Sequence, residues 1–175
     1  MENERDLPWM YWLAGCFSVR RKTKEKLLDM YGTAENIYNM KKQVLNESGF
    51  LTDREKEAFL QRGKVDPERE FEDFFRQGGS FTWIGAADYP QKLQPLSGAP
   101  FALFYYGKLP DPEKKAVAIV GARGCNSYGR AAAGSFAEAA ALAGAEIISG
   151  MACGIDNTAQ LAALRVGGTS TVVLG

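Results

Sequence analysis

Apolar positions in the first 80 residues recur at helical spacing, in short segments that capping and turn residues separate. The segments predicted to be helical are 7–17, 22–30, 34–40, 53–62 and a last one that Asp66-Pro67 opens and Gly78-Gly79 ends. Five short helices in this much chain are typical of a small helical domain that serves in packing or as an adaptor.

Local signals mark where several of these helices begin and end. Thr52 precedes the fourth helix and Glu55 follows three positions later, which is the spacing of a capping box. Thr33 stands at the N-cap position of the third helix, and Gly32 stands where the second helix is expected to end. The last helix carries three apolar side chains that we expect to be buried: Phe71, Phe74 and Phe75.

From residue 80 onwards the pattern is that of strands alternating with helices. Residues 80–84 and 101–106 are rich in aromatic residues and predict two strands, with a Pro-rich connector between them. Further along, apolar runs predict strands at 116–120, 145–149 and 170–174, with helices at 128–144 and 156–166. This order is typical of βαβ units, so the fold class is expected to be α/β with a parallel sheet.

The composition limits the chemistry. The chain of 175 residues has 21 Lys and Arg against 21 Asp and Glu, so it has no net charge and any anion site has to be local. It has no histidine, which excludes Ser-His-Asp catalysis, histidine-ligated zinc and histidine acid–base chemistry. We therefore expect no catalytic residue, no metal and no cofactor.

The cysteines and the apolar segments of the chain indicate where in the cell the protein is expected. Cys16, Cys125 and Cys153 are far apart and form no C-x-x-C motif, so neither a disulfide scaffold nor a structural zinc site is expected. The first ten residues lack the apolar run of a signal peptide, and Glu138 and Glu146 interrupt the longest stretch of small apolar residues. These features predict a cytoplasmic protein that does not span a membrane.

Two loops of the predicted parallel sheet are candidates for ligand binding. Ligands of open parallel sheets lie beyond the carboxyl ends of the strands, where residues 121–129 and 150–156 are expected to form loops. Both loops lead into helix N-termini, which favour anions such as phosphate. Arg123 lies in the first loop and favours an anion site there.

Other interpretations of these loops stay open. The glycines could simply make tight turns. A P-loop is disfavoured because Arg130 and Ala131 stand where Lys and Ser/Thr are needed, and the glycines also miss the G-x-G-x-x-G spacing of a dinucleotide site. Asp156 could cap the second helix of this part of the chain, or could orient Arg123 or a ligand group.

Paired motifs in these loops resemble a known family. Residues 117–123 read VAIVGAR, Tyr128 and Gly129 follow, and residues 148–156 read ISGMACGID. Together with PFALFYYG at 100–107, they resemble the DprA/Smf family, the DNA-processing protein A of natural transformation. The resemblance is strong over residues 80–175 and weak over the helical part.

The resemblance implies two domains. Residues 80–175 are expected to form a Rossmann-like DNA-binding domain with flanking helices, and residues 1–79 a SAM-like helical domain to which we assign no DNA contact. Members of the family continue with further strands, a dimer surface and a RecA contact. The chain is therefore expected to end inside the Rossmann-like domain, to leave part of its parallel sheet exposed, and to self-associate through that surface or lose stability.

The family pattern also implies the site. Its phosphate-contacting arginine falls on Arg123, and Cys153 and Gln160 stand where members have a lysine and often a histidine. The predicted DNA- and phosphate-binding residues are Gly121, Arg123, Ser127, Tyr128, Gly129, Arg130, Ser149, Gly150, Gly154 and Asp156.

The function implied is that of a non-enzymatic recombination mediator, which binds single-stranded DNA and helps load RecA onto it in natural transformation. The alternative is a related Rossmann-like enzyme that cleaves nucleoside monophosphates at the N-glycosidic bond. Such enzymes typically carry a P-G-G-x-G-T loop with a nearby Glu, and this chain has only Gly167-Gly168-Thr169. A pure interaction module is a third possibility.

Overall fold

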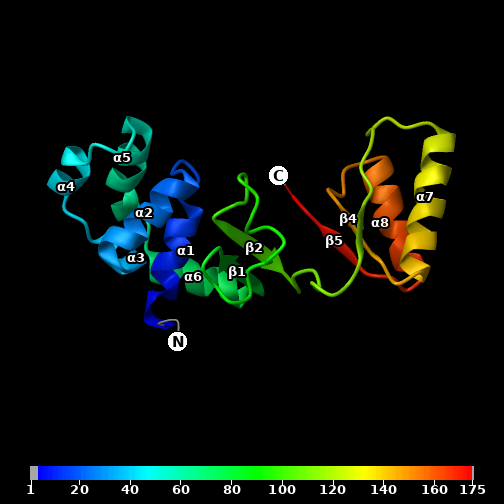
Figure 1. The fold of residues 1–175 in the computed structure, drawn as a ribbon, viewed down its shortest axis with the longest axis horizontal. Coiled ribbons are helices and arrows are strands. Elements are labelled where there is room, and N and C mark those ends of the chain that lie inside the picture. The colour runs from blue at the N-terminus through cyan, green and yellow to red at the C-terminus, as the bar shows by residue number, and fades with distance from the viewer. Residues whose placement is uncertain (1–3, 175) are drawn as a thin grey trace. The chain divides into compact units, whose positions relative to one another are not determined.

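A computed structural model describes residues 4–174 of the chain, which divides into two compact units between Lys108 and Leu109 (Figure 1). The first unit contains helices and a hairpin, and the second contains helices and a parallel sheet. No helix within the described residues is both long and apolar enough to cross a membrane.

Short helices make up most of the first unit. They are η1 (Glu4–Asp6), α1 (Leu7–Gly15), α2 (Arg21–Tyr31), α3 (Ala34–Tyr38), α4 (Lys42–Glu47), α5 (Asp53–Leu60), η2 (Arg62–Lys64) and α6 (Pro67–Arg76). The five predicted helices are confirmed, four of them shorter than predicted and α2 one residue longer at each end, whereas α4 was not predicted. Helix α4 has six residues, buries only Leu45 and lacks a side-chain cap, so it leaves almost no local signal.

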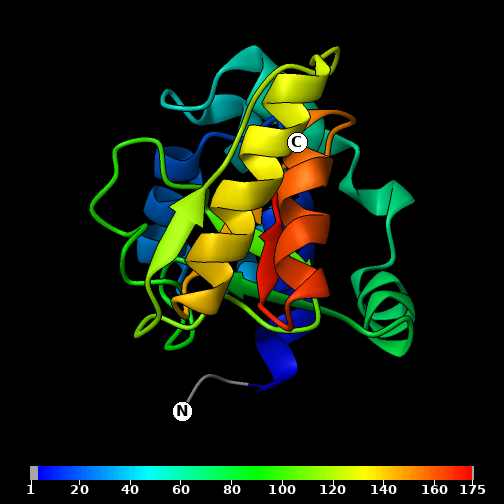
Figure 2. The ribbon, with the colours of Figure 1, turned by 90° about the vertical axis from the view of Figure 1, so that its right-hand side faces the viewer.

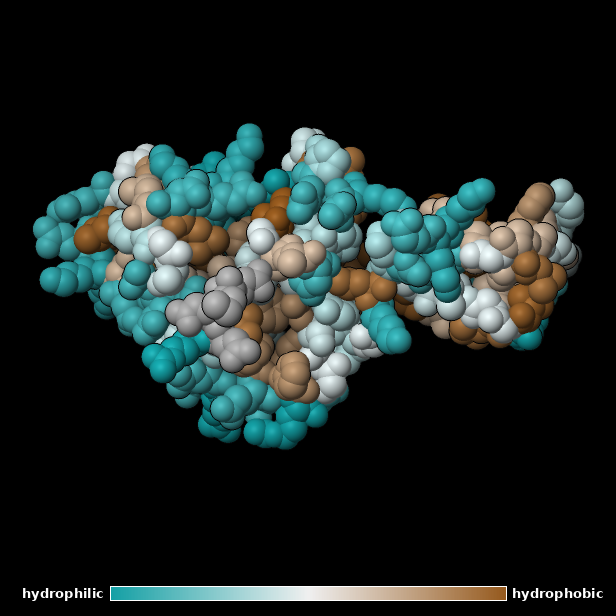
Figure 3. Space-filling view, turned by 60° about the horizontal axis from the view of Figure 1, so that its bottom comes forward, coloured by the Kyte–Doolittle hydropathy of each residue, from teal (hydrophilic) through white to brown (hydrophobic). Residues whose placement is uncertain are grey.

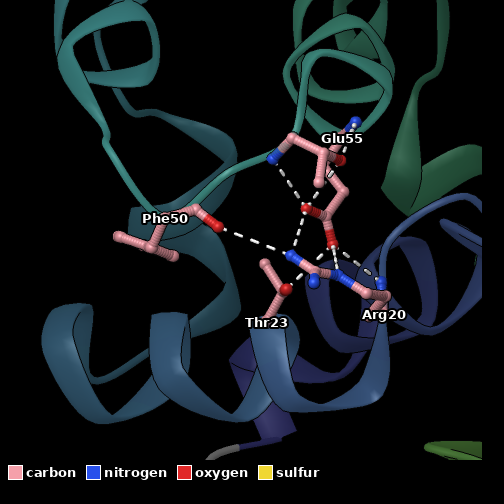
Figure 4. Close-up of polar contacts among 5 residues, drawn as sticks. Arg20, Thr23, Phe50 and Glu55 are labelled. Carbon is pink, nitrogen blue, oxygen red and sulfur yellow. Dashed lines mark hydrogen bonds and ion pairs between the residues drawn. The ribbon is translucent and has the colours of Figure 1, made fainter.

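A buried carboxylate joins the start of α5 to α2. The predicted capping box is confirmed, because Thr52 accepts from the Glu55 backbone N–H and Glu55 accepts from the Thr52 backbone N–H. The same carboxylate also accepts from the Arg20 guanidinium at 2.9 Å and from the Thr23 hydroxyl at 2.8 Å (Figure 4). Glu55 is 1% exposed, so this network lies inside the unit.

A two-stranded hairpin completes the first unit. Strands β1 (Gly79–Trp83) and β2 (Ala102–Tyr106) are antiparallel, with Phe81 opposite Phe104. Both of these rings lie 5.4–5.6 Å from the ring of Tyr11 in α1. Because its aromatic residues pack on α1, the hairpin groups with the helices, and the units divide well after the expected domain boundary at residue 79. The domain assignment itself stays a prediction.

Helix α6 meets the hairpin with only part of its apolar surface. Phe71 and Phe74 are partly buried and lie against Tyr11, as expected. The prediction was wrong for Phe75, which is 64% exposed. Positions 71, 74 and 75 lie within one arc of about 100° on a helix, so their spacing alone predicts burial of all three rings. The ring of Phe75 lies at the edge of this face, 6.1 Å from the ring of Phe71, and is left uncovered there.

The second unit has the predicted alternation of strands and helices. Its elements are β3 (Ala116–Ala118), α7 (Ser127–Leu142), β4 (Glu146–Ser149), α8 (Ile155–Arg165) and β5 (Ser170–Val172). The three strands are parallel in the order β3-β4-β5, which confirms the Rossmann-like α/β prediction. Helices α7 and α8 lie side by side over one face of this sheet (Figure 2).

Small side chains let the two helices approach the sheet and one another closely. The core of the unit contains Ile147 of β4 and alanines of both helices: Ala137, Ala141, Ala159, Ala162 and Ala163. Gly168 fits against this core, since a Cβ atom there would lie 2.6 Å from the Cβ of Ala141.

Several residues of the parallel sheet are exposed, among them all three of β3 and Val172 of β5. Val120 and Val173, which follow β3 and β5, are 71% and 60% exposed. Apolar side chains also reach the surface elsewhere in both units (Figure 3), among them Phe17, Tyr128, Phe136 and Leu142. That part of the sheet lacks a covering the rest of the family has, and that the chain self-associates there, stay predictions.

Candidate nucleic-acid interface

The loops that follow β3 and β4 pack directly on one another. The backbone N–H of Ile155 donates to the carbonyl of Ala122 at 3.4 Å. Gly154 lies so close to the first loop that a Cβ atom would come within 2.3 Å of the Ala122 oxygen and 2.5 Å of the Arg123 oxygen. A Cβ atom on Gly121 would likewise lie 2.7 Å from the Cγ1 atom of Ile155.

These glycines do more than make tight turns. Gly154 has a φ of +102°, a value that residues with side chains rarely adopt. Gly121 has no positive φ, but the side chain of Ile155 leaves no room for a Cβ atom there. Their missing side chains allow the second loop to hold the backbone of the first loop in place. The position of Arg123 therefore depends on Gly154.

Asp156 connects the two strand ends. Its carboxylate accepts from the backbone N–H of Gly121 at 3.0 Å through Oδ1, and from that of Gly150 at 3.3 Å through Oδ2. The N–H of Gly121 first, and then Ser149 and the N–H of Gly150, hold the pKa of this carboxyl below its usual range against the effect of burial. The side chain holds both loops to the start of α8.

This arrangement corrects the prediction that Asp156 caps the helix and shows, among the described residues, no bond from it to Arg123, whereas a contact of Asp156 with a ligand group stays a prediction. Gly154 occupies the N-cap position of α8 and there is no side-chain cap, so Asp156 does not cap the helix. Within residues 4–174, its hydrogen bonds go to Gly121 and Gly150 and none joins it to Arg123. The sequence could not show this, because 35 positions separate Asp156 from Gly121.

Backbone N–H groups at the start of α8 already have hydrogen-bond partners within the protein. Ile155 N–H donates to Ala122, Asn157 N–H donates to the carbonyl of Ala152 at 3.1 Å, and the carboxylate of Asp156 stands in the first turn. Ser149 is 3% exposed and its hydroxyl donates to the carbonyl of Ile119 at 2.5 Å. Four of the predicted contact residues, Ser149, Gly150, Gly154 and Asp156, thus already serve the structure of the loops.

The start of α7 has a different character, because its side chains are exposed. Asn126, which we did not predict, caps this helix by accepting from the Gly129 N–H at 2.8 Å. Ser127, Tyr128 and Arg130 are exposed, Tyr128 to 80%, and Arg123 is exposed just before them. In the described part of the chain, neither guanidinium has a hydrogen bond or an ion pair.

The structure also describes three residues of this region whose state the sequence did not show: Met151, Gln160 and Cys153. Met151 has a φ of +56°, an uncommon value for a non-glycine residue, and nothing in the local sequence signals it. Gln160 is 1% exposed and its amide donates to the Ser170 hydroxyl and the Thr171 carbonyl, at 2.9 and 3.0 Å. At the position where relatives often have histidine, glutamine thus ties α8 to β5. Cys153 is exposed.

The family model of DNA recombination-mediator protein A matches residues 80–175, which include both loops and all three parallel strands. The chain belongs to this family. The resemblance to DprA/Smf proteins that the paired loop motifs indicated is therefore confirmed.

Relatives match over different parts of the chain. Protein Smf of Synechocystis sp. is 29% identical over 182 aligned residues, which cover 100% of this chain and 45% of that protein. Protein Smf of Escherichia coli is 41% identical over 50% of this chain and 23% of its own length. DNA processing protein DprA of Streptococcus pneumoniae is 33% identical over 68% of this chain and 40% of its own. The chain thus spans less than half the length of these relatives.

A solved structure has the same fold. The crystal structure of DNA processing protein A from Streptococcus pneumoniae superimposes with a TM-score of 0.65 and 26% sequence identity. The match covers 95% of this chain and 57% of that one, so it includes the helices of the first unit as well as the parallel sheet.

Proposed function

We propose that the chain binds single-stranded DNA through the exposed side chains around the start of α7. The observation that carries the proposal is the pair of unpartnered arginines, Arg123 and Arg130, beside a helix N-terminus in the region that matches the recombination-mediator family. Guanidinium groups bind phosphate oxygens through two parallel hydrogen bonds, and a helix N-terminus favours an anion.

Tyr128 and Ser127 complete this surface. The Tyr128 ring is 80% exposed beside the two arginines in sequence and offers a face on which an unpaired base can stack. The Ser127 hydroxyl is exposed at the first position of α7 and can donate to a phosphate oxygen. A surface with these groups suits a single strand, whose bases are accessible for stacking.

The other six predicted residues have a supporting role in this proposal. The first loop is held in place by Gly121, Gly150, Gly154 and Asp156. The hydroxyl of Ser149 joins the ends of β3 and β4, and the backbone N–H of Gly129 donates to the capping side chain of Asn126. They determine where Arg123 lies and make no contact with DNA themselves. The predicted site is thereby narrowed to Arg123, Ser127, Tyr128 and Arg130.

The biological role proposed is recombination mediation without catalysis. One relative is named DNA processing protein DprA, and by family membership we propose that this protein acts on incoming DNA in natural transformation, in the cytoplasm, and passes it to RecA. A non-enzymatic role is supported by the lack of histidine and by the Ser149 hydroxyl, which is already bonded to a carbonyl.

Replacing Arg123 by alanine is expected to weaken the binding of a labelled oligothymidine and to make its affinity less dependent on salt. One lost phosphate contact on a single strand lowers the slope of log affinity against log salt by about 0.7. The loss should be about equal for all base sequences, because the contact is to the backbone. Fluorescence anisotropy at several salt concentrations measures both quantities.

Arg165→Ala is the matched control for this experiment. It removes the same charge from the same unit, but it lies in the last turn of α8, away from the loops that follow the strands. We expect it to leave the salt slope unchanged. Equal effects of the two substitutions would contradict a local phosphate contact at Arg123.

A further inference from the structure

The turn between α1 and α2 carries an unusually exposed aromatic side chain. Phe17 is 84% exposed, more than any other large apolar side chain in the described residues. It stands between two surface cavities of the first unit and lines both of them. An exposed ring costs hydration free energy, so its position over two cavities points to a ligand that covers it.

The larger cavity is an aromatic groove of about 810 Å³. Besides Phe17, its aromatic lining consists of Tyr11, Trp12, Phe74 and Phe104. The ring of Phe104 lies 6.2 Å from that of Phe17 and 6.0 Å from that of Phe74, so the rings form a continuous series. Trp12 is 6% exposed and Tyr11, Phe74 and Phe104 are partly buried, so Phe17 is the ring of this series with a free face for stacking.

The smaller cavity, of about 320 Å³, is cationic. Its lining includes Arg20, Arg21 and Lys24 and, among the described residues, no carboxylate. Lys24 is 3% exposed, donates to the Ala14 carbonyl at 2.9 Å and lies 5.0 Å from the centre of the Phe101 ring. Burial lowers its pKa to about 8, so an anion nearby would stabilise its charged form.

Both arginines are ion-paired, yet each keeps donors for a ligand. Arg20 binds Glu55 through Nε and Nη2, and its side chain is still 61% exposed. Arg21 binds Glu25 through Nε and the carbonyls of Leu96 and Ala99 through Nη1. Within residues 4–174, no partner is assigned to Nη1 of Arg20 or Nη2 of Arg21.

We propose that the α1–α2 turn and its two cavities form a second contact for single-stranded nucleic acid, in the first unit. A base lies in the aromatic groove beside Phe17, and the adjoining phosphate lies at Arg20 and Arg21. Aromatic stacking surfaces next to cations that can bind phosphate are the combination by which proteins hold single strands without reading sequence. The contact is separate from Arg123 and extends the proposed function to the first unit.

Phe17→Ala tests this contact in the full chain. Anisotropy titrations would use an oligothymidine of about eight nucleotides and an abasic oligomer of equal length, with Arg123 either intact or replaced by alanine. We expect Phe17→Ala to weaken oligothymidine binding about 5- to 150-fold where Arg123 is replaced, since this is the range for one lost stacked base. Affinity for the abasic oligomer should stay unchanged.

Phe75→Ala is the matched control, because Phe75 is 64% exposed in the same unit and lines neither cavity. A second readout is tryptophan fluorescence, since all three tryptophans belong to the first unit and Trp12 lines the groove. Oligothymidine should change this fluorescence even when Arg123 is replaced, and Phe17→Ala should abolish the change.

The outcomes separate the two proposals. Equal effects of Phe17→Ala and Phe75→Ala would overturn the second contact and leave the role of Arg123 intact. An effect of Phe17→Ala with none of Arg123→Ala would support the second contact and contradict the proposed site at α7. A parent chain that binds no oligonucleotide would contradict both.

Discussion

Replacing Gly154 by alanine is expected to destabilise the second unit by about 3–5 kcal/mol. Two causes add up. The φ of +102° is unfavourable for any residue with a side chain, and the new Cβ atom would lie 2.3 Å and 2.5 Å from the carbonyl oxygens of Ala122 and Arg123. Both oxygens belong to the backbone, so relief requires the first loop to move. Oligonucleotide affinity should fall together with stability.

Hydrogen exchange followed by mass spectrometry measures this effect, because it reports on the peptides of residues 109–174 separately from the rest. Gly124→Ala is the matched control. Gly124 lies in the first loop, has no positive φ, and a Cβ atom there would meet nothing within 4 Å. We expect it to change stability by less than about 0.5 kcal/mol. Unchanged protection in Gly154→Ala would show that the loops do not pack on each other in this way.

The second large effect is expected in the first unit, where Glu55→Gln should lower the free energy of unfolding by about 2–3 kcal/mol. The carboxylate accepts hydrogen bonds from Arg20, Thr23 and Thr52, and a neutral amide cannot satisfy all of these donors. Breaking a fully buried ion pair would destabilise the fold more than this. Here the Arg20 side chain is 61% exposed, so water can hydrate its charge when the carboxylate is gone.

The same carboxylate predicts a dependence on pH. Burial alone would raise the pKa of Glu55, but hydrogen bonds from Arg20, Thr52 and Thr23 outweigh it and hold the pKa far below the ordinary value of 4.5. A carboxyl whose pKa is lowered by folding stabilises the folded state above its ordinary pKa. This stabilisation is lost as the pH falls below 4.5 toward the folded-state value.

Urea unfolding followed by tryptophan fluorescence tests both statements, since Trp9, Trp12 and Trp83 all lie in the first unit. The parent chain should lose stability between pH 4.5 and pH 3 more steeply than Glu55→Gln does. Glu57→Gln serves as the control, because Glu57 lies on the same helix and is exposed. Parallel pH profiles of the parent and Glu55→Gln would contradict the network in Figure 4.

The sequence predicted the elements well where a local signal exists. The capping box of Thr52 and Glu55 and the cap at Thr33 were readable because donor and acceptor are three positions apart. The parallel sheet followed from apolar runs that alternate with helices. Helix α4 was missed because it buries one side chain. The exposure of Phe75 was missed because its spacing from Phe71 and Phe74 is that of one buried face, and only the tertiary packing leaves the edge of this face uncovered.

Long-range contacts were beyond the reach of local patterns. The bond from Arg20 to Glu55 and the bonds of Asp156 join residues whose proximity only the folded chain creates. The loop motifs identified the right region, yet they did not separate exposed groups such as Arg123 from supporting ones such as Gly154. That distinction depends on burial and on the distance between the loops, which no motif encodes.

The most direct test of the account is a titration of the full chain with single-stranded and double-stranded oligonucleotides at two salt concentrations. We expect tighter binding of the single strand. The two phosphate contacts at Arg123 and Arg130 alone predict an affinity for it about sevenfold lower at 200 mM than at 50 mM salt, from a slope of about 0.7 per contact. A phosphate at Arg20 and Arg21 would steepen this dependence further. Equal affinity for both forms, or binding that ignores salt, would contradict a single-strand site built on these arginines.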